Sequence, residues 1–339
     1  MTIVDLARLA GVSDATVSMV LNGKDRGRVS AARREQILAL ARQHGYRRNP
    51  AARALATGRT GRIGLCVSGS ISSHALIGEF SLYVRLGLFA EGIHASGRSI
   101  EIIQIDTRLT PAAVSRELER RAVDGMVFLD WPRQRLEKPL EAIRERGIPA
   151  VASGTVLSEP GCTWTHVDEP AIAADAVRRM VAEGRTRIAM LDTVIGPVSA
   201  DMEEAFRAAV SRASGMPSGE VLVLRPRRPD YEGVQDAVHD LLAREPGLQG
   251  LLLTDNFLAQ GVLNSLRTAG RHPGLDVRVL GYGDTVFADH CSPKLSHYAL
   301  RLEEQARLGL DALLEQIEKG LPETPCHALL PPVCLVRDT

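Results

Sequence analysis

The sequence predicts a two-part α/β protein, with a short all-helical head at the N-terminus and a larger, doubly wound body behind it. Two observations support this division. Basic residues are concentrated in the first 62 residues, and near residue 62 the apolar pattern changes from short amphipathic helices to buried strands that alternate with helices. A chain of 339 residues is also long enough for two or three domains.

The first helix of the head is predicted at the start of the chain. Ile3, Leu6, Ala7 and Ala10 are spaced so that they form one apolar helical face. Gly11 can then adopt the left-handed conformation that ends a helix.

A second short helix follows directly. Ser13 is a natural N-cap for a helix that runs to about Leu21, and Val17 and Val20 fall on its inner face. Because only a glycine turn separates it from the first helix, the pair is typical of a helix-turn-helix.

A third helix is predicted to cover the first two. Ser30 is its expected cap, Gly45 its expected end, and Ile37, Leu38 and Ala41 its buried stripe.

From Arg62 onward, apolar runs alternate with segments that are long enough for crossover helices. Between head and body, residues 49–61 read as a short alanine-rich helix and then a flexible connector. The body is therefore predicted to be a doubly wound α/β fold. Its expected parallel strands are IGLCV, IEIIQI, GMVFL, PAVAS, RIAML, VLVLR, GLLLT and VRVLG.

The net charge of zero conceals an uneven distribution. The first 62 residues hold twelve basic and four acidic residues, a net charge of +8, and the remainder carries −8. A solvated charged surface is the simpler interpretation. The concentration of positive charge in one short segment favours a polyanionic partner instead.

Composition excludes several classes of protein. Hydrophobic residues make up 45% and charged residues 24%, with no apolar run of membrane-spanning length and no signal peptide at the start, so we expect a cytoplasmic protein. The five cysteines form no CxxC pair and the nine histidines are scattered, so we expect no disulfide framework, metal or cofactor. The chain has no GxxxxGK[ST], GxSxG or HExxH motif, which argues against an enzyme.

Longer motifs resemble one family. IVDLARLAGVSDATVSMVLNG and VSAARREQILALARQHGYRRNPAARALATGRTGRIGL are similar to the head of the lactose-repressor (LacI/GalR) family. Through the body, DGMVFL, GIPAV, THVDEPAIAADAVRRMVAEGRTRIAML, TDNFLAQGVLNSLRTAG, VRVLGYGD and LLPPVCLV follow in that family's order and spacing.

The resemblance implies a DNA-binding regulator, usually a dimeric repressor, with a head at 1–48, a hinge at 49–61 and a ligand-sensing body at 62–339. The body would be periplasmic-binding-protein-like, with a ligand cleft between two subdomains and three crossings of the chain. We expect these subdomains at about 62–158 with 289–318, and at about 159–288 with 319–339. We expect a homodimer around Leu82, Leu86 and Phe89, without the leucine-heptad tail of tetrameric relatives.

The resemblance also implies which residues contact double-stranded operator DNA. Asp14, Ala15 and Met19 would face base edges in the major groove, which admits a helix and distinguishes all four base pairs. Phosphate contacts would come from Ser13, Thr16, Ser18, Asn22 and, from the loop, Arg28. Ser13 could equally be only a helix cap, and Asn22 only a helix-end residue.

Two of the reading positions have their own interpretation. Met19 stands where many relatives have an arginine suited to guanine, so the operator should differ at the base that it faces. Asp14 can accept a hydrogen bond from cytosine, or it can simply stabilise the N-terminus of the helix.

Residues 49–57 resemble the family's hinge helix, which folds on DNA. The implied contacts come from Asn49, Ala52 and Leu55, and Leu55 matches the leucine that enters the minor groove.

Family ligand positions match the body unevenly. Met202 stands where an arginine often clamps a sugar, Gly283 replaces the first carboxylate of a strand-end pair and leaves Asp284, and the usual Asn-Asp order reads Asp255-Asn256. A plain hexose or pentose is therefore less expected here than for most relatives, because buried hydroxyls need such partners.

Other ligand candidates come from their place in the predicted sheet. Ser68, Asp130, Asp192 and Asn256 lie at predicted strand ends, where open α/β sheets bind ligands. Trp131, Tyr231 and Arg228 could offer an aromatic face and a cation to a planar or anionic ligand, or could be packing and surface residues.

Three functions fit parts of this pattern. A ligand-responsive repressor explains both the basic head and the cleft-forming body. An effector-independent or protein-modulated regulator with a degenerate pocket explains the head and the missing ligand groups. A transport binding protein would share the body's fold, but it requires export and no basic head.

Overall fold

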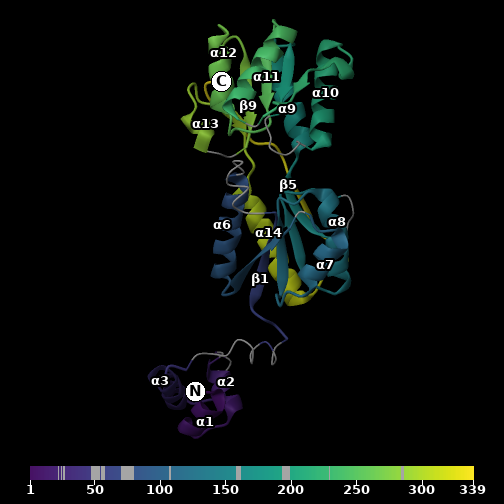
Figure 1. Ribbon diagram of the computed structural model, residues 1–339. Coiled ribbons are helices and arrows are strands. Elements are labelled where there is room, and N and C mark those ends of the chain that lie inside the picture. The colour runs from purple at the N-terminus through teal and green to yellow at the C-terminus, as the bar shows by residue number, and fades with distance from the viewer. Residues whose placement is uncertain are drawn as a thin grey trace. The chain divides into compact units, whose positions relative to one another are not determined.

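The computed structural model describes two units of the chain, Met1–Thr60 and Gly61–Thr339 (Figure 1). The described residues are 1–21, 23, 25, 27–46, 54, 58–69, 80–106, 108–157, 162–192, 199–228, 230–283 and 286–339. Among them, no helix is long and apolar enough to cross a membrane.

The head contains helices α1 (Ile3–Ala10), α2 (Asp14–Leu21) and α3 (Ala31–Gln43). The predicted end of α1 and start of α3 are confirmed, since Gly11 stops α1 at φ 63° and Ser30 Oγ accepts a hydrogen bond from Arg33 N. The helix α3 ends at Gln43, two residues before the predicted Gly45. Thr2 adds a cap that was not predicted. It forms a reciprocal capping box with Asp5, which satisfies free N–H groups at the start of α1.

The three helices of the head share one small core. Leu6, Val17, Val20 and Ile37 are buried in it, as their helical spacing predicts. The guanidinium of Arg33 also donates to the backbone oxygen of Ala10 at 3.0 Å, which ties α3 to the end of α1.

The body contains two six-stranded sheets. The first has the order β11-β5-β4-β3-β1-β2 and is entirely parallel; the second has the order β12-β10-β9-β8-β6-β7 and is parallel except for the β10–β12 pair. The first sheet consists of β1 (Arg62–Ser68), β2 (Ser99–Ile105), β3 (Gly125–Leu129), β4 (Ala150–Ser153), β5 (Thr163–Val167) and β11 (His327–Leu330). The second consists of β6 (Ile188–Leu191), β7 (Val223–Leu224), β8 (Gly250–Leu253), β9 (Arg278–Tyr282), β10 (Ser296–Tyr298) and β12 (Cys334–Leu335).

Helices cover both faces of each sheet, which is why the central strands are continuous apolar runs. On the first sheet, α6 (Phe80–Ala95) and α14 (Leu302–Lys319) pack on one face, and α7 (Pro111–Glu119) and α8 (Arg133–Glu145) on the other. On the second, α9 (Glu169–Ala182) and α10 (Ala200–Ser214) lie opposite α11 (Tyr231–Arg244), α12 (Ala259–Thr268) and α13 (Val286–His290). A short 3-10 helix spans Ser218–Glu220.

The eight predicted strands are all present, as β1 to β4 and β6 to β9. The expected subdomain boundaries are wrong at three strands, because β5 and β11 belong to the first sheet and β10 to the second. The reason is that TWTHV has only two apolar residues, Trp164 and Val167, and that SHY and HALL are short, so none of them reads as a buried strand. The chain crosses between the sheets after Val167, after Tyr298 and after Leu330.

The expected dimer contact is also corrected. Leu82 and Phe89 are buried in the core that α6 forms with the first sheet, and Leu86 packs against the same core. Leu82 and Phe89 are therefore not available to an interface, whereas Leu86 is only half-buried.

Candidate DNA-binding and ligand-binding sites

The N-terminal end of α2 presents its polar residues to solvent. Ser13, Asp14 and Ala15 are exposed, whereas Val17 and Val20 on the opposite side are buried. Three of the predicted DNA-contacting residues therefore lie together on one open surface. Thr16, Ser18 and Met19, which follow along the helix, are half-buried.

Local hydrogen bonds hold this surface in place. Ser13 Oγ accepts from Thr16 N at 3.2 Å and lies 2.9 Å from the Thr16 hydroxyl, so Ser13 is a helix cap. Asp14 Oδ1 accepts from the backbone N–H of Ala15 at 2.8 Å. Both residues have the structural role that the sequence allowed, and both remain exposed to a partner.

The loop that carries Arg28 is anchored by Asp25, a residue that sequence reasoning missed. The side chain of Asp25 is buried and pairs with Arg34, Oδ2 to Nε at 3.1 Å, and its backbone oxygen accepts from Arg28 N at 2.9 Å. Arg28 itself is exposed. An isolated acid between Gly23 and Gly27 in a basic segment was the available signal.

Five predicted site residues lie outside the described residues. They are Asn22, Asn49, Ala52, Leu55 and Asp284.

In the body, Ser68 and Trp131 line a pocket of about 70 Å³ at the carboxyl edge of the first sheet. Trp131 is buried, its indole N–H donates to Cys66 O at 2.9 Å, and its ring packs edge-on against Phe128. Trp131 is thus mainly a core residue, with little ring surface left for a ligand.

Asp130 follows β3 at the same edge and is held by Arg85, which sequence reasoning did not single out. Arg85 Nε donates to Asp130 Oδ2 at 3.2 Å, and Arg85 Nη1 donates to Gln305 Oε1 at 2.8 Å and to Ser153 Oγ at 3.2 Å. Asp130 has φ 50°, and a Cβ on Gly154 would lie 1.9 Å from its Oδ1. Only glycine leaves room for the carboxylate at that position.

On the second sheet, Asp192 is buried and hydrogen-bonded at the end of β6. Its carboxylate accepts from Thr254 Oγ1 and from Arg225 Nε, both at 2.8 Å, and Arg225 also contacts Glu203. The hydrogen bonds to Glu203 and Asp192 raise the pKa of Arg225. The network places a cation and two carboxylates at the carboxyl edge of the second sheet.

Asp255 and Asn256 follow β8 at the same edge. Burial raises the pKa of Asp255 to about 6. Asn256 is buried, and its Nδ2 donates to Gly283 O at 2.5 Å. Asn256 thereby fixes the loop after β8 to the end of β9.

The remaining candidates differ in accessibility. Met202 is completely buried in the core beside α10 and cannot reach a ligand. Arg228 is exposed and paired with Glu232 at 2.8 Å, and Tyr231 is 46% exposed at the start of α11.

A further polar group lies at the first crossing of the chain. Tyr282 OH donates to Glu169 Oε1 at 3.0 Å, and His166 Nε2 lies 3.7 Å from the same oxygen. Burial lowers the pKa of His166 and raises that of Tyr282, so both are neutral near pH 7. The THVDEP motif contains His166 and Glu169, but in the sequence it only indicates the family resemblance and not this polar group.

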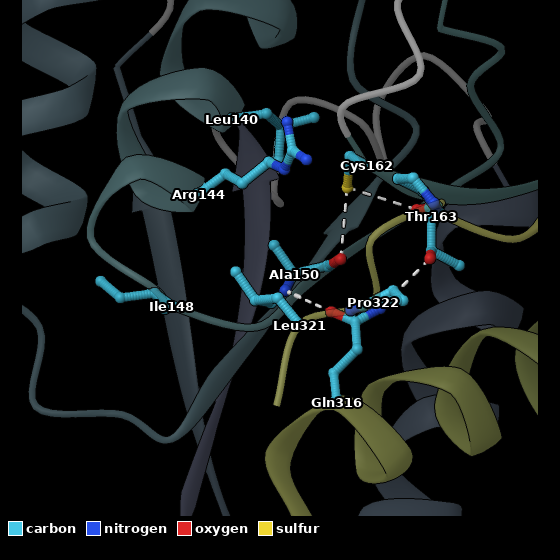
Figure 2. A pocket seen from close by; sticks show the side chains of 10 residues that line it. Leu140, Arg144, Ile148, Ala150, Cys162, Thr163, Gln316, Leu321 and Pro322 are labelled. Atoms are coloured by element: carbon cyan, nitrogen blue, oxygen red, sulfur yellow. Dashed lines mark hydrogen bonds between the residues drawn. The ribbon is translucent and has the colours of Figure 1, made fainter. Parts of the chain in front are cut away.

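A second pocket, of about 20 Å³, lies at the opposite end of the first sheet (Figure 2). There Gln316 bridges two strands, since its Oε1 accepts from Ala150 N and its Nε2 donates to Thr163 Oγ1. None of the predicted ligand residues lines this pocket.

Comparisons with known proteins agree with this architecture. A family model for bacterial regulatory proteins of the lacI family matches residues 2–49, and one for a periplasmic binding protein-like domain matches residues 177–339. The HTH-type transcriptional regulator CelR of Thermobifida fusca is 30% identical over 344 residues, which cover 98% of this chain and 96% of CelR. The chain belongs to the lacI family. Its helix-turn-helix head and two-sheet body make it a DNA-binding transcription regulator of that family.

Other lacI-family relatives match over similar lengths. The ribose operon repressor of Escherichia coli K12 is 28% identical over 93% of each chain. A structure described as a CelR–cellobiose complex matches with a TM-score of 0.68, at 26% identity over 100% of this chain and 99% of that one. The lac repressor dimer bound to operator and the anti-inducer ONPF matches the fold with a TM-score of 0.78, at 23% identity over 100% and 98%.

Proposed function

We propose that this lacI-family protein is a homodimeric repressor without catalytic activity, whose affinity for a near-palindromic operator is controlled by a small polar ligand held between the two sheets of the body. The observation that carries the proposal is the exposed N-terminal end of α2, with Ser13, Asp14 and Ala15 open to solvent on a head of strongly positive net charge. Two identical heads related by a two-fold axis would read two inverted half-sites.

In this proposal α2 lies in the major groove. Asp14, Ala15 and Met19 would read base edges, and Ser13, Thr16, Ser18 and Arg28 would hold phosphates. The buried Asp25–Arg34 pair supports the loop from which Arg28 reaches the backbone.

The ligand would be bound by groups at the carboxyl edges of both sheets. Asp130 and Ser68 belong to one edge, and Asp192, Asp255 and Asn256 to the other. Carboxylates of this kind accept hydrogen bonds from hydroxyls, which favours a polyhydroxylated ligand. The cellobiose in the CelR complex and the name of the ribose operon repressor point to the same class of ligand.

For the dimer, we propose a surface of the first subdomain that the fold leaves open. Val84 on α6 and Ile100 and Ile102 on the edge strand β2 are 45%, 36% and 53% exposed. A second copy would bury these apolar side chains, which Leu82 and Phe89 cannot offer.

The second candidate function, a regulator without a small-molecule effector, is favoured by Met202. That side chain is buried in the core where relatives often have a sugar-clamping arginine. Such a regulator would respond to a protein partner or to none.

One experiment tests both candidates. Genomic DNA bound by the full chain is footprinted, and operator affinity is measured with and without cellobiose, ribose and a panel of other polyols. We expect a near-palindromic footprint, a steep loss of affinity with salt, and a change of affinity with at least one polyol. Specific binding by residues 61–339 alone would refute the DNA site, and an unresponsive full chain would favour the second candidate.

A further inference from the structure

The segments that cross between the two sheets of the body are fastened to one another. Asp168 N donates to Leu330 O at 2.8 Å, and Ala299 N donates to Val333 O at 2.9 Å. Hydrogen-bonded crossing segments of this kind fix a pivot, and they leave the subdomains able to rotate about it.

A different contact joins the subdomains through residues outside the crossing segments. Phe80 is the first residue of α6, which packs on the first sheet, and Phe257 lies between β8 and α12 of the second. Their ring centroids are 5.8 Å apart, and the ring planes are inclined by 34°. This separation is within the range at which aromatic rings attract each other.

We propose that Phe80 and Phe257 form an aromatic clasp that holds the two subdomains of the body together. Because the rings belong to different subdomains, any rotation that separates the sheets must break the contact and expose both rings to water. The clasp thus stabilises the closed arrangement only.

The clasp is weak enough to regulate a change of shape. Phe80 remains 40% exposed and Phe257 is half-buried, so the pair is not part of a sealed core. An aromatic pair shifts an equilibrium by about two- to tenfold beyond its burial. A ligand that prefers one arrangement can overcome a bias of this size, so the clasp would set how much ligand is needed.

The test measures closure directly, without DNA or ligand. Dyes are attached through non-natural amino acids at the exposed positions Gln134 on α8 and Ser218 in the 3-10 helix, one on each subdomain. The labelled full chain is diluted with unlabelled chain so that each dimer carries one dye pair. Single-molecule energy transfer then gives the ratio of open to closed molecules.

Phe80→Ala and Phe257→Ala should each raise the open-to-closed ratio by about two- to tenfold. In the double variant, the open-to-closed ratio should be only slightly higher than in the more affected single variant, because both substitutions remove the same contact. Phe257→Tyr keeps a ring and should stay near the original ratio. Leu275→Ala removes an apolar side chain of the second subdomain that is 77% exposed, and should change nothing.

An unchanged ratio in both alanine variants, or fully additive effects in the double variant, would overturn the clasp. Phe80→Leu and Phe257→Leu repeat the measurement with less loss of volume, should an alanine variant fail to fold.

The link from the clasp to DNA binding rests on the proposed function and is measured apart, as operator affinity of the same variants. If the original chain binds no operator, the proposed function fails while the energy-transfer result still decides the clasp.

Discussion

Arg85 holds Asp130 from inside the first subdomain, with Arg85 Nε 3.2 Å from Asp130 Oδ2. The two side chains differ in their access to water, since that of Arg85 is 3% exposed and that of Asp130 is 25% exposed. The carboxylate can be solvated if its partner is lost, and the guanidinium cannot. The pair therefore orients an acceptor at the carboxyl edge of the sheet. Removing the carboxylate should cost more folding free energy than removing the guanidinium.

This asymmetry predicts unequal costs for the two partners. Asp130→Asn should destabilise the body by about 3 kcal/mol, because it leaves a buried guanidinium without a counter-charge. Arg85→Met should cost less, since Asp130 keeps partial access to water and the methionine fills the space. Asparagine also tolerates the positive φ of that position. Urea unfolding of both variants checks the order, and an equal or reversed cost would contradict it.

Asp255 predicts a pH dependence of stability. Burial raises its pKa to about 6 from the usual 3.8, so the folded protein binds this proton more tightly than the unfolded chain does. The resulting stabilisation is fully present below about pH 4 and is lost as the pH rises through about 6. Near pH 7, Asp255→Asn should therefore be more stable than the original chain by on the order of 3 kcal/mol.

The check is the free energy of unfolding of both proteins between pH 4 and pH 8. The difference should vanish at the acidic end and grow with pH. A difference that stays constant over that range would show that Asp255 does not titrate as described.

The sequence predicted the parts of the fold whose cause is local. The end of α1 follows from Gly11 and the start of α3 from Ser30, and the eight predicted strands are apolar runs. The prediction places the crossing before β5 instead of after it, because that strand has only two apolar residues, Trp164 and Val167, and does not read as a continuous apolar run.

The candidate site was harder to predict because its partners are distant in sequence. Arg85 reads as an ordinary basic residue on an amphipathic helix, yet its partners lie 45, 68 and 220 residues away. Met202 is a ligand candidate because of its position in the family pattern, and Trp131 because of its aromatic side chain. Neither criterion shows that both side chains are buried.

Substitution of Leu55 tests the role of the hinge. This prediction rests on the family resemblance, because Leu55 lies outside the described part of the chain. A leucine wedged into the minor groove offsets a few kcal/mol of unstacking by bending the duplex toward further contacts. Leu55→Ala should therefore reduce both operator affinity and DNA bending, and leave dimerisation unchanged. Gel mobility of circularly permuted operator fragments reports the bend, and an unchanged bend with unchanged affinity would remove the hinge from the mechanism.

Met19 predicts a change in which base is read. It is half-buried on α2, between the exposed end of the helix and the buried Val20, so its side chain has both a packing side and an open side. An arginine can extend its guanidinium past that boundary and form two hydrogen bonds with guanine, which methionine cannot.

Met19→Arg should then favour guanine at one symmetric pair of operator positions by about 1 to 3 kcal/mol. Affinity for unrelated DNA should change far less, because the phosphate contacts proposed for Ser13, Thr16 and Arg28 would be kept. Competition binding against operators substituted at each position measures this preference, with Ala39→Arg on an exposed position of α3 as a control for the added charge. If Met19→Arg weakens binding to every sequence alike, Met19 is a packing residue of the head and the operator is read by its neighbours.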